Sequence, residues 1–528
     1  MTNKNILDYW PITSPPRPNQ VRVLNWLAEQ TAKYVICEMP VGSGKSLVGL
    51  TYARYLSGKD GSSFILTPQR ILQHQYEQTL GDKALFSLYG KGNYKCSTKS
   101  TTCDVGSAMK PRCKHCPHRD AIGSAKKTPN VVLNYKLAML LFGYTEVFED
   151  TRKLMVLDEC HTLEEHLTEF GAISINRTKT FKMGIQWKFA PNVVSAFDWV
   201  RNVYLPGIRR ELSRVFGEIE PLLDKPGVDL TRAEQTKLKQ YAKLEDHVDE
   251  VAEFALTNPD VIANTRVLVH DKENIKFKHL TGVTNFDRLL DGRTEQYLFM
   301  SSTIINHEGF CRDVGLPLSD VAFLSIDSDF PPENRPVVYM PQMKMNSTWN
   351  KPENHQSRHK MVDTIKQILT EHGGESGIIH TGNFLIASWL VEHLDGKVPQ
   401  QILHHNPDSG DDRNAIINQF GANPKPSVLI SPSITEGLDL KDDLGRFAII
   451  AKIPFGNLGD QWIKRRLEMS GEWYQRRALI DVIQGGGRVV RSSEDEGIVY
   501  ILDGSWDYLY SQTIRMVPNW WKQAYHVL

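Results

Sequence analysis

Short apolar runs that end in polar or charged residues recur along the chain. Nine of them lie at residues 34–38, 64–67, 131–134, 154–158, 297–301, 377–381, 427–431, 447–451 and 497–502. Parallel sheets covered on both faces produce continuous apolar runs of this kind, and ligands gather at the carboxyl ends of their strands. The pattern predicts two α/β domains with parallel sheets, joined near residues 305–335, close to the Pro-rich segment 329–336.

Two stretches of different composition interrupt the first of these domains. Residues 90–124 have almost no aliphatic periodicity, so we expect a bound metal to replace the missing core. Residues 170–290 show charged helical patterning, clearest at 231–246, and predict an inserted helical subdomain. The expected divisions are 1–89, 125–169 and 291–305 for the first domain, 90–124 for the metal segment, 170–290 for the helical insertion and 306–528 for the second domain.

Composition adds only broad limits. The 528 residues predict about three or four domains. The 62 basic and 62 acidic side chains give zero formal charge, so a nucleic-acid partner would have to meet a local basic groove. Residues 1–16 show no apolar core with a cleavage site, and no apolar run approaches the roughly 18 residues of a membrane span. We therefore expect an intracellular protein with no membrane partner.

The segment Pro40–Ser46 follows an expected strand and is expected to open a helix, which is the context of a phosphate-binding loop. Gly42 and Gly44 permit close backbone approach, Lys45 would reach the β- and γ-phosphates, and the Ser46 hydroxyl would bind Mg²⁺. The alternative is a Gly-Ser turn that happens to precede a lysine. The motifs farther along the chain disfavour it.

Asp158 and Glu159 follow four apolar residues, so both carboxylates should emerge at the sheet edge that faces the phosphates. Asp158 would bind Mg²⁺ directly or through water, and Glu159 would orient and deprotonate the attacking water. His161 would relay the nucleotide state to the second domain. The alternative is a solvated strand end beside a buried Cys160.

A third motif, residues 484–491, contains three glycines between Gln484 and the pair Arg488 and Arg491. The arginines are three residues apart, which predicts one helix face after a Gly-rich turn. If the domains close on ATP, both would reach the γ-phosphate from the far side of the cleft. A solvated basic helix face would explain the arginines but not Gln484 or the glycines.

Together these motifs resemble those of superfamily 2 DNA helicases of the XPD/DinG type, with a DECH box at Asp158–His161 in place of DEAH or DEAD. The resemblance covers nearly the whole chain. It extends to the adenine-reading segment Arg17–Gln20, the backbone-gripping motif Thr67–Arg70, the Ser-Ala-Thr coupling motif Met300–Ile304, the Glu-Gly-x-Asp segment Thr435–Leu440 and the Leu-Pro-Phe turn Lys452–Phe455.

The resemblance implies two RecA-like motor domains, the first with a small metal-binding insertion and a helical arch. It implies an ATP-dependent DNA helicase that moves 5′→3′ on single-stranded DNA and acts at single/double-strand junctions as a monomer. The residues expected to hold ATP and Mg²⁺ are Arg17, Gln20, Pro40, Gly42, Ser43, Gly44, Lys45, Ser46, Asp158, Glu436, Gly437 and Asp439. The expected location is the cytoplasm of a bacterial or phage-infected cell, or the nucleus of a eukaryote.

Two other functions stay open. One is a DNA-stimulated ATPase that remodels nucleoprotein or RNA–DNA structures without processive unwinding. The other is a nucleotide-gated binding module whose motor has decayed, against which the intact Lys45, Asp158, Glu159, Arg488 and Arg491 argue. A nuclease is disfavoured because no further acidic cluster stands out.

Four cysteines lie within 21 residues, at Cys96, Cys103, Cys113 and Cys116. In a reducing compartment such a group indicates a metal rather than disulfides. Four thiolates suit a [4Fe–4S] cluster or tetrahedral Zn²⁺ equally. The resemblance favours the iron–sulfur cluster, because this family places its iron–sulfur domain between the backbone-gripping motif and the DECH box.

Nucleic-acid contacts are predicted from basic residues and aromatics. One set crowds the cysteine segment: Lys91, Lys95, Lys99, Lys110, Arg112, Lys114 and Arg119. A second set interleaves aromatic and basic residues, and half of it is expected to be core or domain interface: Trp462, Lys464, Arg465, Arg466, Trp473, Tyr474, Arg476 and Arg477. A single strand would be held by phosphate contacts and stacking.

Overall fold

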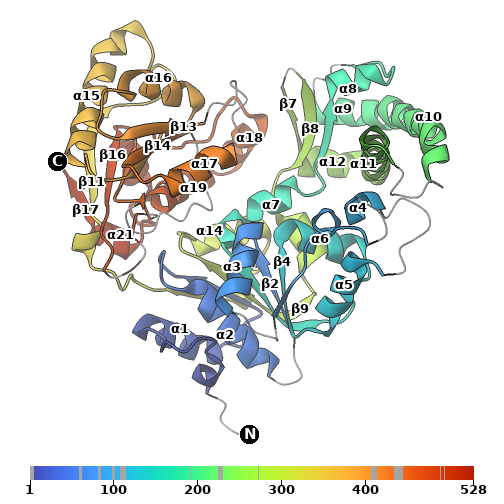
Figure 1. Cartoon of the computed structure of the whole chain (residues 1–528), viewed down its shortest axis with the longest axis horizontal. Helices are drawn as coiled ribbons and strands as arrows, with labels where there is room; N and C mark the ends of the chain where they lie inside the picture. Colours follow the sequence, from blue (N-terminus) through green and yellow to red (C-terminus); the bar gives the residue numbers. More distant parts are fainter. Residues whose placement is uncertain are drawn as a thin grey trace.

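The computed structural model contains two domains, each built on a seven-stranded sheet, and a subdomain inserted into the first (Figure 1). The described residues are 5–58, 62–80, 85–97, 101–106, 115–188, 190, 192–223, 230–271, 273–405, 413–432, 444–487, 489–490, 492 and 494–528. Every strand pair in the two large sheets is parallel. The predicted pair of parallel α/β domains is therefore confirmed.

The first sheet contains all five strands predicted for it and two more at its edges. Its spatial order is β10 (Val321–Ser325), β1 (Tyr34–Glu38), β9 (Thr294–Ser301), β5 (Arg152–Asp158), β2 (Ser63–Thr67), β4 (Asn130–Asn134) and β3 (Leu85–Ser87). Its helices are α1 (Pro18–Ala28), α2 (Lys45–Ser57), α3 (Arg70–Leu80), α5 (Pro117–Lys127), α6 (Tyr135–Tyr144), α7 (Leu163–Glu169), α13 (Val283–Asn285) and α14 (His307–Val314).

The second sheet contains the four predicted strands at its centre. Its order is β13 (Gln401–His404), β14 (Ser427–Ser431), β12 (Gly377–His380), β15 (Phe447–Ile450), β16 (Ile498–Asp503), β11 (Val337–Met343) and β17 (Tyr525–Val527). Its helices are α15 (His355–Glu371), α16 (Phe384–Leu394), α17 (Arg413–Ala422), α18 (Gln461–Met469), α19 (Gly471–Gly486), α20 (Trp506–Thr513) and α21 (Asn519–Gln523).

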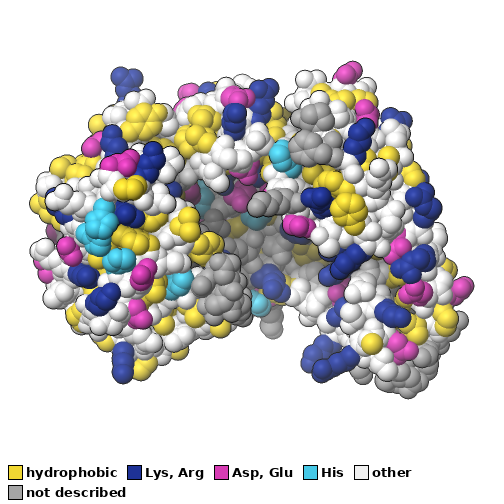
Figure 2. Space-filling view, turned by 90° about the horizontal axis from the view of Figure 1, so that it is seen from above, with side chains coloured by type: hydrophobic (Ala, Val, Ile, Leu, Met, Phe, Trp, Pro, Cys, Tyr) yellow, Lys and Arg dark blue, Asp and Glu magenta, His cyan; other side chains and the backbone are white. Residues whose placement is uncertain are grey.

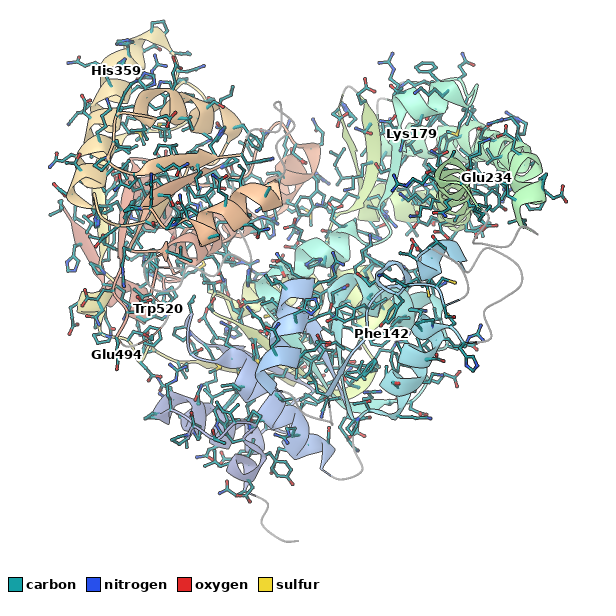
Figure 3. All side chains as sticks on the ribbon, viewed as in Figure 1. Phe142, Lys179, Glu234, His359, Glu494 and Trp520 are labelled. Atoms are coloured by element: carbon teal, nitrogen blue, oxygen red, sulfur yellow. The ribbon has the colours of Figure 1, made fainter. Side chains whose placement is uncertain are left out.

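The apolar runs are continuous because both faces of each large sheet are covered. In β1, Ile36 packs into one core and Val35 into another on the opposite face, since successive side chains of a strand alternate. The second domain likewise has a core on each side of its sheet. Phe142 lies in one core of the first domain, and Trp520 lies in one core of the second domain; both are labelled in Figure 3.

The border between the two domains differs from the expected one at residue 306. β10 pairs in parallel with β1, and Phe310 and Cys311 of α14 pack into the core of the first domain. Residues 306–325 therefore belong to the first domain, and the linker follows them. The Pro-rich segment from which we predicted the linker lies in this connection between the domains. Only the preceding residues, 306–325, were assigned to the wrong domain.

The inserted subdomain is helical, as predicted, but also contains a three-stranded antiparallel sheet. The sheet order is β6 (Ile173–Asn176), β8 (Asn274–His279) and β7 (Arg266–His270). The helices are α8 (Arg177–Lys182), α9 (Val193–Trp199), a π-helical turn (Val200–Tyr204), α10 (Leu205–Leu223), α11 (Arg232–Ala255) and α12 (Pro259–Thr265). We call residues 173–279 the arch-like subdomain. Among the described residues no helix is long and apolar enough to cross a membrane.

Strand register brings three motifs to one edge of the first sheet. Glu38 at the end of β1 lies beside Ser301 of β9, and Asp158 at the end of β5 lies beside Met300. All these strands run in the same direction, so their carboxyl ends meet there. The segments that leave this edge are the phosphate loop, the DECH box and the expected coupling motif, which reads Ser301-Ser302-Thr303 here and is called the Ser-Ser-Thr motif below.

Candidate nucleotide site and interdomain contacts

The phosphate loop joins β1 to α2 and needs its glycines for conformation. Gly42 and Gly44 have φ of 75° and 76°, in the left-handed region that L-residues with a Cβ rarely adopt. A Cβ on Gly44 would also lie 2.4 Å from Gln20 Nε2. α2 begins at Lys45, so its unpaired N–H groups and positive dipole end face the loop. This arrangement suits the binding of an anionic phosphate chain.

The two carboxylates meet the start of α2. The Ser46 hydroxyl donates a hydrogen bond to Asp158 Oδ2 at 3.2 Å, and the Tyr76 hydroxyl donates to the same oxygen at 2.9 Å. Lys45 Nζ lies 3.6 Å from Glu159 Oε1. Glu159 itself has φ of 52°, an uncommon conformation for a residue with a side chain and one found at functional sites.

Burial and the neighbouring Glu159 carboxylate together raise the pKa of Asp158 to about 6, although the Lys45 ammonium opposes both effects. A buried carboxylate of this kind gains from a divalent cation beside it. The Ser46 hydroxyl and the Asp158 carboxylate are oxygen ligands of the type Mg²⁺ prefers. The side chains present therefore fit the expected magnesium ion.

Arg17 and Gln20 donate hydrogen bonds to the phosphate loop. The Arg17 guanidinium donates to the Gly42 carbonyl at 2.6 Å, and Gln20 Nε2 donates to the Ser43 carbonyl at 2.8 Å. Gln20 Oε1 in turn accepts from the Arg17 backbone N–H at 2.8 Å, which caps α1. The segment expected to read adenine thus also fixes the shape of the loop.

A chain of contacts leads from the DECH box to the second domain. His161 Nδ1 lies 3.4 Å from Glu159 Oε2 and 2.8 Å from Ser301 Oγ. Ser301 Oγ accepts from the Thr303 N–H at 3.2 Å, and Gln484 Nε2 donates to Thr303 Oγ1 at 2.5 Å. Gln484 lies on α19 of the second domain, so the path crosses the domain border.

Glu38 is a functional residue that the sequence did not single out. It precedes the phosphate loop and is 5% exposed. Its Oε1 accepts from the Ile304 and Ile305 N–H groups at 2.8 and 2.6 Å, and its Oε2 accepts from the Ser325 hydroxyl at 2.9 Å. These bonds hold Ile305 at a φ of 67°. A glutamate inside an apolar strand was the available signal, because buried charge requires partners.

We expected the glycines to precede a helix that carries Arg488 and Arg491, and the structure corrects the order of helix and glycines. α19 ends at Gly486 with Gly487 as its cap, and the described residues Val489 and Val490 are not helical. The glycines therefore end a helix instead of introducing one, in keeping with the usual place of glycine. Arg488 and Arg491 lie outside the described residues, as do three expected nucleotide-binding residues, Glu436, Gly437 and Asp439.

The cysteine segment is described in part. A short helix, α4 (Cys103–Gly106), contacts α11 of the arch-like subdomain. Cys103 Sγ and Cys116 Sγ are 3.9 Å apart. Zn–S bonds of about 2.3 Å at tetrahedral angles place two thiolates roughly 3.8 Å apart, so this pair fits ligation of one metal ion. Cys113 lies outside the described residues, and no group of three metal-ligating side chains occurs within them.

Burial raises the pKa of the Cys103 thiol, and the nearby Cys116 raises it further. Both effects favour the neutral thiol unless a cation supplies positive charge, because thiolates are the metal-binding form. Cys103 is therefore not a reactive thiolate in the absence of a cation.

The second predicted nucleic-acid set is mainly a domain interface. Trp462, Arg466, Trp473 and Arg476 are each at most 6% exposed. Arg466 donates to Glu164 Oε1 at 2.7 Å and to Asp313 Oδ1 at 2.6 Å. Trp473 Nε1 donates to Glu164 Oε2 at 2.8 Å, and Arg476 pairs with Asp313. We call Glu164, Asp313, Arg466, Trp473 and Arg476 the interdomain cluster. The burial of Trp462, Arg466, Trp473 and Arg476 confirms that half of the predicted set is core or domain interface.

A hollow lies between the two halves of the protein (Figure 2). Figure 2 shows this face, with Lys and Arg side chains along the rim of the hollow. Arg70, from the expected backbone-gripping motif, donates to Asn93 Oδ1 at 2.5 Å at the edge of the cysteine segment. Of the basic residues predicted around the cysteines, Lys91, Lys95 and Arg119 are described, and Lys99, Lys110, Arg112 and Lys114 are not.

Two known families match, one in each half of the chain. Residues 17–190 match the DEAD/DEAH box helicase family, and residues 357–524 match the helicase C-terminal domain family. The first segment contains the phosphate loop and the paired carboxylates. The second contains α19 with Gln484 and its terminal glycines.

Two named relatives share part of the chain. It is 23% identical over 243 residues to the ATP-dependent DNA helicase YoaA of Haemophilus influenzae, covering 43% of this chain and 36% of the relative. It is 24% identical over 233 residues to the ATP-dependent DNA helicase DinG of Photobacterium profundum, covering 41% and 33%. The matched segment thus spans about a third of the length of these relatives.

Solved structures match the whole chain at low identity. An XPD helicase superposes with a TM-score of 0.62 and 16% identity over 100% of both chains. Xpd4 of S. tokodaii superposes with a TM-score of 0.58 and 12% identity over 97% of this chain and 100% of that one. The chain therefore has the two-domain fold of XPD helicases and carries a DEAD/DEAH box helicase domain followed by a helicase C-terminal domain.

Proposed function

We propose that the protein is an ATP-dependent DNA helicase that moves 5′→3′ along single-stranded DNA and separates duplex DNA. The observation that carries the proposal is that Lys45, Ser46, Asp158 and Glu159 meet at one sheet edge. The hydrogen bond from Gln484 to Thr303 connects this edge to the second domain. Such a site, shared between two domains, lets nucleotide binding and hydrolysis change the domain arrangement. The DNA helicases YoaA and DinG, to which the chain is similar, support the substrate.

In the proposed reaction Lys45 and the N–H groups of Gly42 and Gly44 bind the β- and γ-phosphates, and the Ser43 N–H closes the loop by donating to the Pro40 carbonyl at 3.2 Å. Pro40, Arg17 and Gln20 shape the loop and the adenine side of the site. Ser46 and Asp158 hold Mg²⁺, which neutralises phosphate charge when bound.

Glu159 orients the attacking water and accepts its proton. The water oxygen forms a bond to the γ-phosphorus while the bond from that phosphorus to the β–γ bridging oxygen breaks, which yields ADP and phosphate. We assign to Arg488 and Arg491 the stabilisation of the negative charge that develops on the transferring phosphoryl group. We assign Glu436, Gly437 and Asp439 to the second-domain side of the cleft. Gln484 couples this side to the Ser-Ser-Thr motif.

We further propose that Cys96, Cys103, Cys113 and Cys116 hold a metal at the point of strand separation. The position of the segment in the chain favours a [4Fe–4S] cluster, and the 3.9 Å between Cys103 Sγ and Cys116 Sγ suits zinc, which remains the alternative. The contact of α4 with α11 places this segment against the arch-like subdomain. Single-stranded DNA at a junction is the proposed partner of both, and a monomer suffices for this motor.

The test is a strand-displacement assay with 5′ or 3′ overhangs, together with ATPase measured with and without single-stranded DNA. Lys45→Ala is expected to abolish ATP hydrolysis and unwinding and to leave single-stranded DNA binding within about twofold, because the lysine lies at the nucleotide site beside Glu159 and DNA binding uses other surfaces. Hydrolysis at the wild-type rate would refute the nucleotide site. DNA-stimulated hydrolysis in the wild type without strand displacement would support the alternative, a DNA-stimulated ATPase that remodels nucleoprotein or RNA–DNA structures.

A further inference from the structure

Glu38 contacts the segment that joins the Ser-Ser-Thr motif to α14. Its Oε1 accepts hydrogen bonds from two consecutive backbone N–H groups, those of Ile304 and Ile305, at 2.8 and 2.6 Å. Glu38 is the last residue of β1, and only Met39 separates it from the phosphate loop. One carboxylate oxygen beside the loop therefore binds the backbone of a segment that is 266 positions away in the sequence.

Ile304 and Ile305 belong to the cores of different domains although they are consecutive. Ile304 is 1% exposed and packs into one core of the first domain. Ile305 packs against the core of the second domain that contains Val489 and Trp521. The chain must therefore turn sharply between these two residues.

This turn is closed by one backbone hydrogen bond. The Asn306 N–H donates to the Ile304 carbonyl at 2.7 Å, across Ile305 with its φ of 67°. A three-residue turn with a positive φ at its centre is rare and strained, and a β-branched residue seldom adopts such a φ. The conformation persists only where the surrounding contacts impose it. The bonds to Glu38 fix the two peptide groups through which the chain enters this turn, residues 304–306, which we call the docking turn.

Hydrogen bonds from both ends of α19 flank the docking turn. Near the end of the helix, Gln484 donates to Ser302 and Thr303, which immediately precede the turn. Near the start of the helix, Glu472 Oε1 accepts from Asn306 Nδ2 at 3.1 Å. The first domain therefore binds α19 on either side of the residue that Glu38 holds.

α19 also reaches the phosphate loop. A Cβ on Gly487, the C-cap of this helix, would lie 3.0 Å from Val41 Cγ2. The position of α19 on the docking turn therefore decides how the second domain covers the loop. Glu38 and Val41 belong to one short segment, since the first ends β1 and the second lies in the loop that follows it.

The contacts of Glu38 require an acceptor and not a charge. Burial raises the pKa of Glu38, although its three donors oppose that shift. A neutral carboxyl keeps the same contacts, because its carbonyl oxygen accepts from both N–H groups and its O–H donates to the Ser325 hydroxyl. Glutamine offers the same acceptor and the same donor.

We propose that Glu38 is a positioning residue, which fixes the docking turn and thereby the place of the second domain over the phosphate loop. The effect on turnover rests on the proposed helicase function. The effect on the docking of the two domains does not, so the two can fail separately.

A distance between the domains measures the docking. Spin labels introduced as unnatural amino acids at the exposed Arg22 and Lys397 report on the first and the second domain. In the nucleotide-free protein, Glu38→Met should broaden the distribution of distances between the labels, because methionine keeps the side-chain volume but leaves two N–H groups without their acceptor. Glu38→Gln should keep the wild-type distribution.

Turnover gives the second readout. Glu38→Met should lower the DNA-stimulated kcat on the order of tenfold and change the dissociation constant for ATP by less than about threefold. Ile305→Ala, which removes the contact with the second-domain core, should have the same two effects, and it tests the link even if Glu38→Met does not fold. The double variant should lower kcat little more than either single variant, since both act through one turn.

Ser325→Ala is the matched control. It removes only the third contact of Glu38, which comes from β10 within the first domain, and it should match the wild type in both readouts. If Glu38→Gln were as impaired as Glu38→Met, the charge would matter and the positioning role would be wrong. Wild-type distances and turnover in Ile305→Ala and in a folded Glu38→Met would also overturn it. Absence of DNA-stimulated ATPase in the wild type would refute the proposed function alone, because the distances still test the docking.

Discussion

At single positions, burial decides what a titratable side chain does. Glu38 is buried but accepts three hydrogen bonds, and it fixes the backbone beside the phosphate loop. His279 is buried as well, at 6% exposure, and its Nε2 has no hydrogen-bond partner among the described residues. Burial raises the pKa of Glu38 and its three hydrogen-bond donors oppose that shift, whereas burial lowers the pKa of His279.

The state of His279 predicts acid sensitivity. Burial, together with the nearby Arg266 and Arg288, lowers the pKa of His279 from 6.5 to about 3. The unfolded chain therefore binds a proton below pH 6.5 that the folded chain does not, so the free energy of unfolding falls as the pH falls from 6.5 towards 3. At about 1.36 kcal/mol per pH unit the loss is about 2 kcal/mol at pH 5.

Chemical denaturation between pH 7.5 and 5 measures this loss. His279→Gln should lower stability at pH 7.5 but flatten the pH dependence by about 2 kcal/mol, because glutamine does not titrate. The exposed His526 is the control, and His526→Gln should leave the slope unchanged. Equal slopes for the wild type and His279→Gln would show that His279 titrates normally in the fold.

Among the elements, α19 has the clearest functional consequence. Gln484 donates to Ser302 Oγ at 2.9 Å and to Thr303 Oγ1 at 2.5 Å. Gln484→Ala is expected to leave the dissociation constant for ATP within about twofold and to lower kcat on the order of tenfold, since two neutral hydrogen bonds are together worth about 1–3 kcal/mol.

ATP binding and steady-state hydrolysis, measured side by side, distinguish coupling from binding. The control is Gln475→Ala on the same helix, where the amide donates to the Tyr508 hydroxyl at 3.2 Å. A raised KM with unchanged kcat in Gln484→Ala would mean that the glutamine serves binding and not coupling between the domains.

How far the sequence predicts the elements depends on their burial pattern. The central strands were predicted because both faces are covered and the runs are continuously apolar. Edge strands such as β3 and β17 are only three residues long and leave too little pattern. β8 was missed although Ile275 and Phe277 alternate with Lys276 and Lys278, a period of two that indicates a half-buried strand. Long-range pairing, such as β10 with β1, is set by topology and not by local sequence.

The residues of the candidate site also divide into those that the sequence predicts and those that it does not. Lys45, Ser46, Asp158 and Glu159 were predicted because their chemistry requires those residue types beside a strand end, and the structure brings them together. The contacts of Glu38 and of Trp462 join residues that are more than 180 positions apart, and no local pattern encodes them.

The cysteine segment is the element that should depend on metal. Cys103→Ser is expected to lose the metal and abolish unwinding, because ligation replaces a hydrophobic core there. DNA-stimulated ATPase should persist at least in part, since Lys45 and Asp158 lie elsewhere. Protein purified without oxygen should contain about four iron atoms per chain for a cluster, or one zinc ion for the alternative.

Metal analysis and strand displacement on the same preparations check this prediction. Cys311→Ala is the matched control, because Cys311 is equally buried but lies in α14. It should retain the metal. Normal unwinding by Cys103→Ser would exclude the segment from strand separation.

At the scale of the whole molecule, the interdomain cluster decides how the two domains stay together. Arg466 is 3% exposed and has two carboxylate partners, Glu164 and Asp313, in the first domain. Such buried pairs are weak contributors to net stability, but removing one partner strands the others in a low dielectric. The cluster therefore specifies the docking geometry more than it strengthens the fold.

Arg466→Met tests this distinction because it keeps most of the side-chain volume and removes the charge. We expect a destabilisation of about 3–5 kcal/mol, observed by calorimetry as a fall of the first thermal transition by several degrees. Arg465→Met is the neighbouring control: Arg465 is exposed and pairs with Glu468 on the surface, a contact worth about 0–1 kcal/mol. If both variants shifted the transition equally, the cluster would not hold the domains together. If Arg466→Met alone also lowered DNA-stimulated ATPase while ATP binding persisted, the docking geometry set at the cluster would be required for α19 to complete the nucleotide site.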